Sequence, residues 1–63
     1  MTIDEKKIEL NLARKQMTMQ ELAESCNVSR QRMHVILNSK SVTPATVGRV
    51  AKALDVDVAD IIA

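Results

Sequence analysis

Apolar residues recur along the chain three or four positions apart, which is the period of an α-helix with one buried face. Ile8 and Leu12 form one such pair. Two later stretches each place four apolar residues at positions i, i+3, i+4 and i+7, namely Met19, Leu22, Ala23 and Cys26, then Val47, Val50, Ala51 and Leu54. No stretch shows the sustained alternation of a half-buried strand. The pattern therefore predicts an all-α fold.

The ends of the first two helices carry residues that stabilise helix termini. We expect the first helix over Asp4–Lys15, because acidic residues at its start and basic residues at its end complement the helix dipole. Thr18 followed by Glu21 has the spacing of a capping box, which opens a second helix. Leu10 lies about half a turn from the buried stripe of the first helix. It either packs against another part of the fold or is exposed for a partner.

A very short joint separates the second helix from the third. Asn27 follows the last apolar position of the second helix, and asparagine is the usual second choice, after glycine, for the left-handed residue that ends a helix. Ser29 is a favoured N-cap, so the next helix starts two residues later. Its buried side consists of Met33, Ile36 and Leu37. Its other side consists of Arg30, Gln31, His34, Val35 and Asn38. This predicts a helix-turn-helix, with Val28 filling its corner.

Two further helices are expected after a polar loop at residues 38–41. Thr43 is a cap, and Pro44 takes the first helical position, where proline is favoured. Gly48 costs this fourth helix about 1 kcal/mol relative to alanine, so it marks a close helix approach or has no structural role. A short fifth helix opens with Asp57 and Asp60 and carries Val58, Ile61 and Ile62 on one side.

The composition limits the core and the chemistry. The chain of 63 residues contains no Phe, Tyr or Trp, so its core must consist of Leu, Ile, Val, Met and Ala. We expect one small domain over residues 1–63, burying about 60 % of its unfolded surface. One cysteine and one histidine exclude an internal disulfide and a zinc site made by this chain alone. Nucleophile, base and metal ligands form no constellation, so we expect no enzyme, no cofactor and no metal, with Cys26 in the core.

Charge is distributed unevenly, although the net charge is only +1. No acidic residue occurs from Ser25 through Leu54, while that segment holds Arg30, Arg32, Lys40, Arg49 and Lys52. This favours an anionic partner, the alternative being a chance run on a solvated surface. The sequence shows neither the roughly 20 apolar residues of a membrane span nor a signal peptide. We therefore expect a cytoplasmic protein with no membrane partner and no small-molecule ligand.

The stretch MTMQELAESCNVSRQRMHVILNSK, residues 17–40, resembles the helix-turn-helix of the phage-repressor family, the XRE type related to Cro and λ repressor. The stretch TP…RVAKALDVDVADII resembles the fourth and fifth helices of that family. The resemblance extends from about Ile8 to Ile62. It implies a compact five-helix, λ-repressor-like domain whose third helix lies in the major groove of DNA.

The resemblance also implies roles for individual residues. Arg30, Gln31 and Val35 match base-contacting positions, with His34 beside them, either touching DNA or hydrated. The phosphate-contacting candidates are Thr18, Ser29, Arg32, Asn38, Lys40 and Ser41. The chemistry agrees, because Arg can bind guanine, Gln can bind adenine, Val can pack on a thymine methyl and Lys suits a phosphate. The alternative for the Arg-Gln-Arg run is an ordinary solvated helix face.

Three positions depart from the family pattern. Met19 stands where many members have a glutamine that helps to clamp phosphate, so we expect a weaker clamp there. Leu12 and Leu37 stand where several members bury an ion pair, and an apolar pair in that place is often neutral or stabilising. Asn27 replaces the usual glycine of the turn.

We therefore expect a sequence-specific regulator of transcription that binds double-stranded DNA, and most simply a repressor of a prokaryote or mobile element, associated with the nucleoid when bound. Two half-sites would require a homodimer. Its interface residues would be Leu10, Ile61 and Ile62, although the two isoleucines could instead complete the core. The alternative function is a protein-interaction module, such as an antitoxin or accessory factor, with Leu10, Val35 and Ile62 as exposed apolar contacts.

Overall fold

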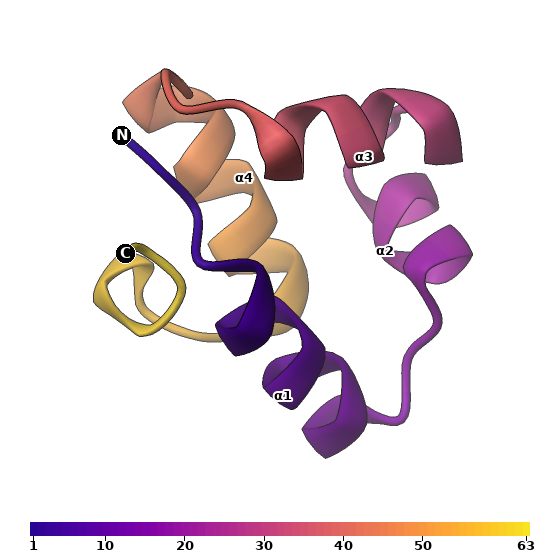
Figure 1. The fold of residues 1–63 in the computed structure, drawn as a ribbon. Coiled ribbons are helices and arrows are strands. Elements are labelled where there is room, and N and C mark those ends of the chain that lie inside the picture. Colours follow the sequence, from indigo (N-terminus) through magenta and orange to yellow (C-terminus); the bar gives the residue numbers. More distant parts are fainter.

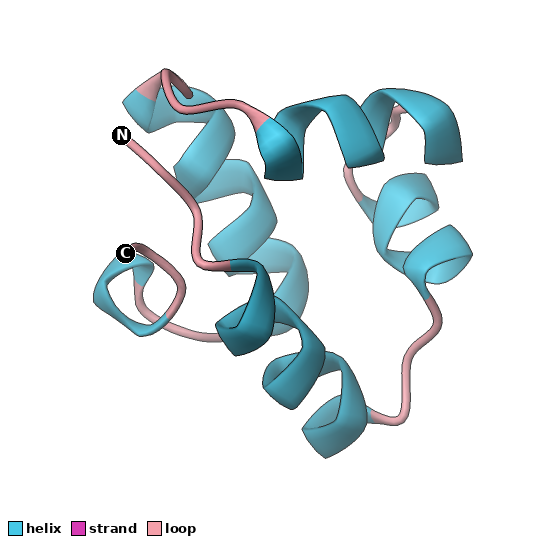
Figure 2. Cartoon of the chain, in the orientation of Figure 1, coloured by secondary structure: helices cyan, strands magenta, loops and turns pink.

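A computed structural model describes residues 1–63 and contains four α-helices. These are α1 (Glu5–Lys15), α2 (Met19–Ser25), α3 (Arg30–Asn38) and α4 (Pro44–Leu54), followed by a single 3₁₀ turn, η1 (Val58–Asp60) (Figures 1 and 2). The only β-type pairing is an isolated antiparallel bridge between Ile3 and Ile62. None of the helices has the length and apolar character needed to cross a membrane. The all-α class is confirmed.

Three helices begin after their predicted caps, and α1 begins at Glu5, one residue later than expected, with Asp4 as its cap. Asp4, Thr18, Ser29 and Thr43 each have extended backbone angles, and each side chain accepts a hydrogen bond from an amide of the first helical turn. At Thr18 the capping box is complete, because the Glu21 side chain also accepts from the Thr18 amide. These bonds satisfy amides that a helix start leaves without an intrahelical partner.

Three helices end in the same way, at a non-glycine residue in the left-handed conformation. Gln16, Asn27 and Asp55 have φ values of 55°, 59° and 57°. The next residue in each case is apolar and half-buried, and its amide donates to a carbonyl five residues earlier, as Val28 does to Ala23 at 3.0 Å. This is the Schellman arrangement. The sequence predicts it at Asn27 and does not reveal it at the other two, which lack a Gly or Asn signal.

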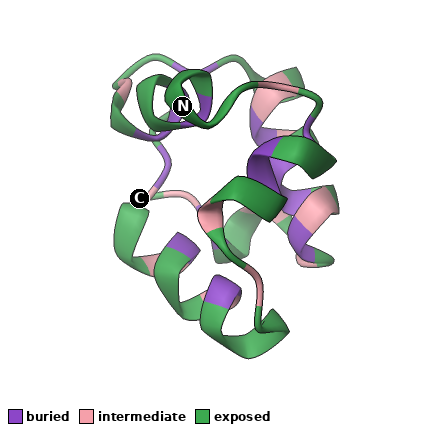
Figure 3. Ribbon diagram, turned by 90° about the vertical axis from the view of Figure 1, so that its right-hand side faces the viewer, coloured by how far each residue is buried: buried purple, intermediate pink, exposed green.

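One cluster of 15 buried residues forms the core, and it consists of aliphatic, methionine and cysteine side chains. Figure 3 marks the buried positions along the ribbon. It includes Ile8 and Leu12 of α1, Leu22 and Ala23 of α2, Cys26 directly after α2, and the complete stripes of α3 and α4. Met19 is the α2 exception, since it is half-buried and packs against the cluster. α4 contacts α1, α2 and η1, and α2 also contacts α3, so α4 carries the helix-turn-helix on the rest of the fold.

The prediction of a fifth helix is wrong, because the structure has only a 3₁₀ turn there. Asp57 and Asp60 do form a capping box, but the turn that they open, η1, has only three residues. The backbone then becomes extended and pairs with the start of the chain, where Ile61 O accepts from Asp4 N at 2.8 Å and Ala63 N donates to Thr2 O at 2.9 Å. These bonds use groups that a longer helix would need for itself. Ile3, which lies in this paired segment, and Val42, which pairs with Met1, are buried core residues that the helical pattern does not reveal.

Gly48 does not mark a close helix approach, because a methyl group built on it would meet no heavy atom of another element within 4 Å. Gly48→Ala should therefore stabilise the protein by about 0.8–1.0 kcal/mol through helix propensity. For a domain of this size that corresponds to a rise in Tm of roughly 4–8 °C. Thermal unfolding followed by far-UV circular dichroism checks this. Ala53→Gly, in the same helix, is the opposite control, and an unchanged or lower Tm for Gly48→Ala would contradict the prediction.

Candidate nucleic-acid interface

α3 lies across one end of the molecule and has one buried and one open side (Figures 1 and 3). Met33, Ile36 and Leu37 face the core, whereas the other six residues of the helix are exposed. At 100° per residue, Gln31 and Val35 lie opposite the buried side, and Arg30 and Arg32 lie on its two flanks. The helix therefore presents an amide and an apolar group between two guanidinium groups.

The angle of α3 to α2 is fixed by the turn between them. Asn27 is left-handed, its amide donates to Glu24 O at 3.0 Å, and half-buried Val28 packs against the core. Ser29 then starts α3, its Oγ accepting from the Arg32 amide at 3.0 Å. The turn of the helix-turn-helix and the role of Val28 in its corner are as predicted. The first turn of α3 is thus held in a defined orientation.

All of the proposed base-contacting residues are exposed on α3: Arg30, Gln31, His34 and Val35. Val35 is 52 % exposed, which is unusual for a large apolar side chain in a chain that buries its other valines wholly or partly. The structure brings these four side chains onto one helix within about one and a half turns. An exposed valine beside polar groups that suit base edges is chemically suited to a groove of duplex DNA.

The proposed phosphate-contacting residues lie at the starts of α2 and α3, on α3 itself, and in the loop after it. Thr18 and Ser29 use a hydroxyl lone pair for capping, so each hydroxyl hydrogen is still available to donate. Arg32 lies on the flank of α3, and Asn38, Lys40 and Ser41 are exposed at its end and in the following loop. Met19, at the first position of α2, has no polar group to add to this set.

A pocket of about 180 Å³ separates the Arg32 flank of α3 from the start of α4. Among its lining residues are Val35, Ser41, Thr43 and Thr46. Thr43 Oγ1 donates to Thr46 Oγ1 at 3.0 Å, and it also accepts from the Thr46 amide. Sequence reasoning identifies Thr43 only as a cap and misses Thr46. The signal for Thr46 is its place three residues after the cap, the N3 position of the helix.

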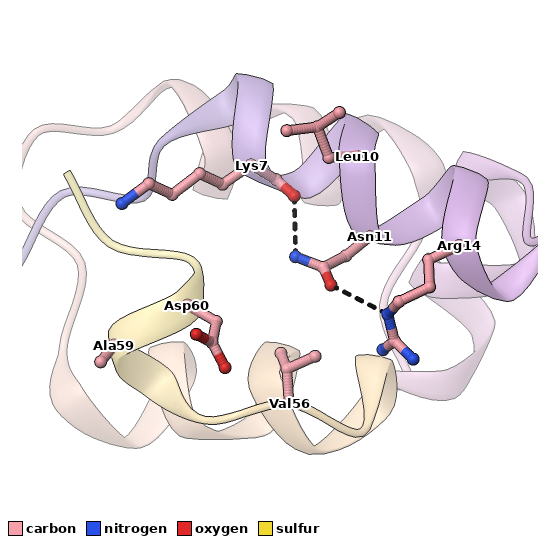
Figure 4. Close-up of a pocket in the computed structure, with 7 residues that line it drawn as sticks. All are labelled: Lys7, Leu10, Asn11, Arg14, Val56, Ala59 and Asp60. Atoms are coloured by element: carbon pink, nitrogen blue, oxygen red, sulfur yellow. Dashed lines mark hydrogen bonds between the residues drawn. The ribbon is translucent and has the colours of Figure 1, made fainter.

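A second pocket, of about 410 Å³, lies between α1 and the segment after α4 (Figure 4). Leu10, Val56 and Ala59 supply its apolar lining, and the polar lining comes from Lys7, Asn11, Arg14 and Asp60. Both cationic lining residues also connect α1 to the C-terminal part of the chain. Lys7 Nζ donates to Ile62 O at 3.0 Å, and Arg14 Nη2 donates to Leu54 O at 2.8 Å.

The three residues suggested for a dimer interface occupy different environments. Leu10 lines the second pocket and is 66 % exposed. Ile61 is 0 % exposed and completes the core, because its side chain is enclosed when the last residues fold back against the N-terminal segment. Ile62 is half-buried. Ile61 is therefore removed from the candidates for an interface, and Leu10 and Ile62 remain.

Cys26 is buried beside α4, with its Sγ 4.0 Å from the carbonyl oxygen of Arg49. Burial raises the pKa of the thiol above its usual value, and the positive charge of Arg49 opposes this effect only in part. The folded state therefore holds the thiol proton more tightly than the unfolded state does. The resulting stability is present below the ordinary thiol pKa of about 8.5 and is lost as the pH rises through the raised folded value.

We expect Cys26 to react with a thiol reagent roughly 100-fold or more slowly in the native protein than in denaturant at pH 8. The reason is that native reaction requires both opening of the core and loss of the thiol proton. Ellman's reagent gives the two rates directly. The loss of stability between pH 8 and pH 10 should also be smaller in Cys26→Ala than in the wild type. Equal native and denatured rates would show that the thiol is accessible.

Comparison with known proteins agrees with this geometry. The family model of the Cro/C1-type HTH DNA-binding domain matches residues 7–63, which includes α2, α3 and α4, the whole α2-turn-α3 unit, and all of α1 except its first two residues. None of the curated proteins and none of the solved structures matches the chain. The matched region covers nearly the whole chain, and it contains the segment, from about Ile8 to Ile62, in which the sequence resembles the family. The chain belongs to the family of Cro/C1-type helix-turn-helix DNA-binding domains.

Proposed function

We propose that residues 1–63 act as one sequence-specific DNA-binding domain that regulates transcription, with α3 lying in the major groove. The observation that carries this proposal is the open side of α3, where Gln31 and Val35 face outward between Arg30 and Arg32. No acidic residue lies on α3, on α4 or in the loop between them. Attraction to phosphate is therefore not opposed by a carboxylate on the same surface.

Each exposed group of α3 has a defined task in this proposal. Arg30 donates two hydrogen bonds to guanine O6 and N7, and Gln31 pairs with adenine N6 and N7. Val35 packs on a thymine methyl group, and His34 contacts the adjacent base edge. The contacts that hold the helix in register are made to phosphates, by Thr18, Ser29, Arg32, Asn38, Lys40 and Ser41.

Repression is the mode of regulation that we propose, because a small domain seated on a promoter excludes polymerase without needing a cofactor. Such a domain works on DNA in the cytoplasm of a prokaryotic cell. The test is a selection of bound duplexes from randomised DNA, followed by affinity measurements at several salt concentrations. The proposal requires an enriched motif and an affinity that falls linearly with salt on logarithmic axes. Absence of binding to any duplex at low ionic strength would refute it.

We also propose that two copies act together on two half-sites, meeting through Leu10 and Ile62. Leu10 is the most exposed large apolar residue of the chain and borders the pocket of 410 Å³. Ile62 lies near its edge, where its carbonyl oxygen accepts from Lys7. A second copy would remove this apolar surface from water. A two-fold arrangement would also match a palindromic operator.

Leu10→Glu should turn a dimer into a monomer and weaken binding to a two-half-site operator by about 10²–10⁴-fold, because the second copy no longer binds intramolecularly. Binding to a single half-site should be unchanged. Analytical ultracentrifugation and fluorescence anisotropy give the two readouts. Ala13→Glu is the matched control, since Ala13 is exposed on α1 and does not line the pocket. A monomeric wild type at high micromolar concentration, with and without operator, would refute the dimer.

A second candidate function is a protein-interaction module that retains the helix-turn-helix frame. Two of the three exposed large apolar residues, Leu10 and Val35, lie on α1 and α3 and would suit a protein partner. Retention on heparin separates the two functions. A DNA-binding domain is retained strongly at low salt and released steeply as salt rises, whereas an interaction module shows little retention.

A further inference from the structure

The first four residues form a strap that links the α3–α4 loop to the C-terminal segment (Figure 1). We call Met1–Asp4 the N-terminal strap. On one edge, Met1 exchanges two backbone hydrogen bonds with Val42, at 2.7 and 2.8 Å. On the other edge, Thr2 O and Asp4 N bond to Ala63 and Ile61. The strap is therefore fixed on both sides by backbone bonds, and buried Ile3, 3 % exposed, anchors its middle in the core.

The hydroxyl of Thr2 adds one further hydrogen bond, to the backbone of Lys40, which is one of the proposed phosphate-contacting residues. Thr2 Oγ1 donates to the carbonyl oxygen of Lys40 at 3.0 Å across 38 residues of sequence. Lys40 and Ser41 are themselves exposed, so their side chains are available to solvent. The backbone at Lys40 is held by its hydrogen bond to the strap. Val42 closes the arrangement, because its side chain is buried. The strap thus fixes the backbone of the loop and leaves its polar side chains free.

Such an arrangement matters for binding to a charged polymer. A loop that must become ordered on binding loses backbone freedom at that moment, and this loss reduces affinity. A loop already held in place avoids the loss. Within the loop itself the Ser41 amide bonds only to Ser39 Oγ, at 3.2 Å, so the strap supplies the long-range support.

We propose that Thr2 is a positioning residue for DNA binding, which orients Lys40 toward phosphate by holding the Lys40 carbonyl. This inference rests on the proposed function and adds to it a residue that does not touch DNA. It predicts that the contribution of Thr2 to affinity passes through Lys40. Its contribution should consequently carry no base preference and should appear in the salt dependence of binding.

A double-mutant cycle tests this coupling. Thr2→Val keeps the shape of the side chain and removes the hydroxyl, and should weaken binding about 2- to 10-fold, equally on specific and random duplexes, with a smaller salt slope. In a Lys40→Ala background the same change should have almost no effect. Thr2→Ser retains a hydroxyl and should restore wild-type binding. Fluorescence anisotropy over a salt series supplies all of these values.

A variant that is destabilised far from the loop shows whether Thr2→Val acts through the position of Lys40 or only through a loss of protein stability. Ala53→Gly lowers stability near the far end of α4 and should leave the salt slope unchanged. The inference is overturned if Thr2→Val binds like the wild type, or if its effect is the same in the Lys40→Ala background. Wild-type protein that binds no duplex would overturn the proposed function, and this inference with it. Wild-type binding with an additive cycle would overturn the inference alone.

Discussion

Replacing Leu22 by alanine is expected to lower the free energy of unfolding by about 2–5 kcal/mol. Leu22 is 0 % exposed, and it lies in the middle of α2 within the single core cluster. With no aromatic residue in the chain, the core contains no larger side chains that could shift into the space. Domains of this size typically have a total stability of roughly 3–9 kcal/mol. Leu22→Ala should therefore leave a large fraction of the protein unfolded at physiological temperature.

Urea denaturation followed by far-UV circular dichroism measures this effect, since the chain has no tryptophan to report it by fluorescence. Leu10→Ala is the matched control, because it makes the same chemical change at an exposed position. Its effect on the protein at low micromolar concentration should lie within about 0.5 kcal/mol of zero. Similar losses for the two variants would contradict the division into a buried and an open side on which the fold depends.

Arg30→Ala and Gln31→Ala should each reduce affinity for the selected operator by about 1–3 kcal/mol, which is roughly 5- to 150-fold. Each should also relax the base preference at one position of the operator. Both side chains are exposed and neither belongs to the core, so thermal unfolding should be unchanged. Anisotropy titrations against the operator and against duplexes changed at single base pairs measure affinity and preference together.

Lys40→Ala provides the contrast for those two variants. A lysine that contacts phosphate contributes affinity without sequence information, so its loss should weaken all duplexes alike and lower the salt slope by about 1. Arg30 or Gln31 variants that lose affinity identically on operator and random DNA would contradict direct reading of bases by α3.

Local signals allowed most of the helical frame to be predicted. Thr18, Ser29 and Thr43 cap helices through their own side chains, so their effect depends on residues only three positions away. The buried stripes follow the helix period for the same reason. What the sequence did not reveal depends on contacts between distant parts of the chain. Ile3 and Val42 are buried because the N-terminal strap pairs with residues 61–63 and with the α3–α4 loop.

The candidate interface shows the same division between local and long-range information. The exposed side of α3 follows from helix geometry and from its three buried residues, so its members could be predicted from sequence. Thr2 could not be identified in this way. Thr2 reaches Lys40 only because the first residues fold back along the loop. The short η1 has the same origin, since Ile61 O bonds to the strap and not within a helix.

We propose above all that the open side of α3 is the surface that contacts DNA. The most direct measurement is a titration of ¹⁵N-labelled protein with the selected duplex, followed by amide chemical shifts. We expect the largest changes on residues 29–35 and 38–41, with residues 7–14 of α1 little affected at a single half-site. Largest changes around Leu10 and the pocket between α1 and η1, with α3 unchanged, would contradict it.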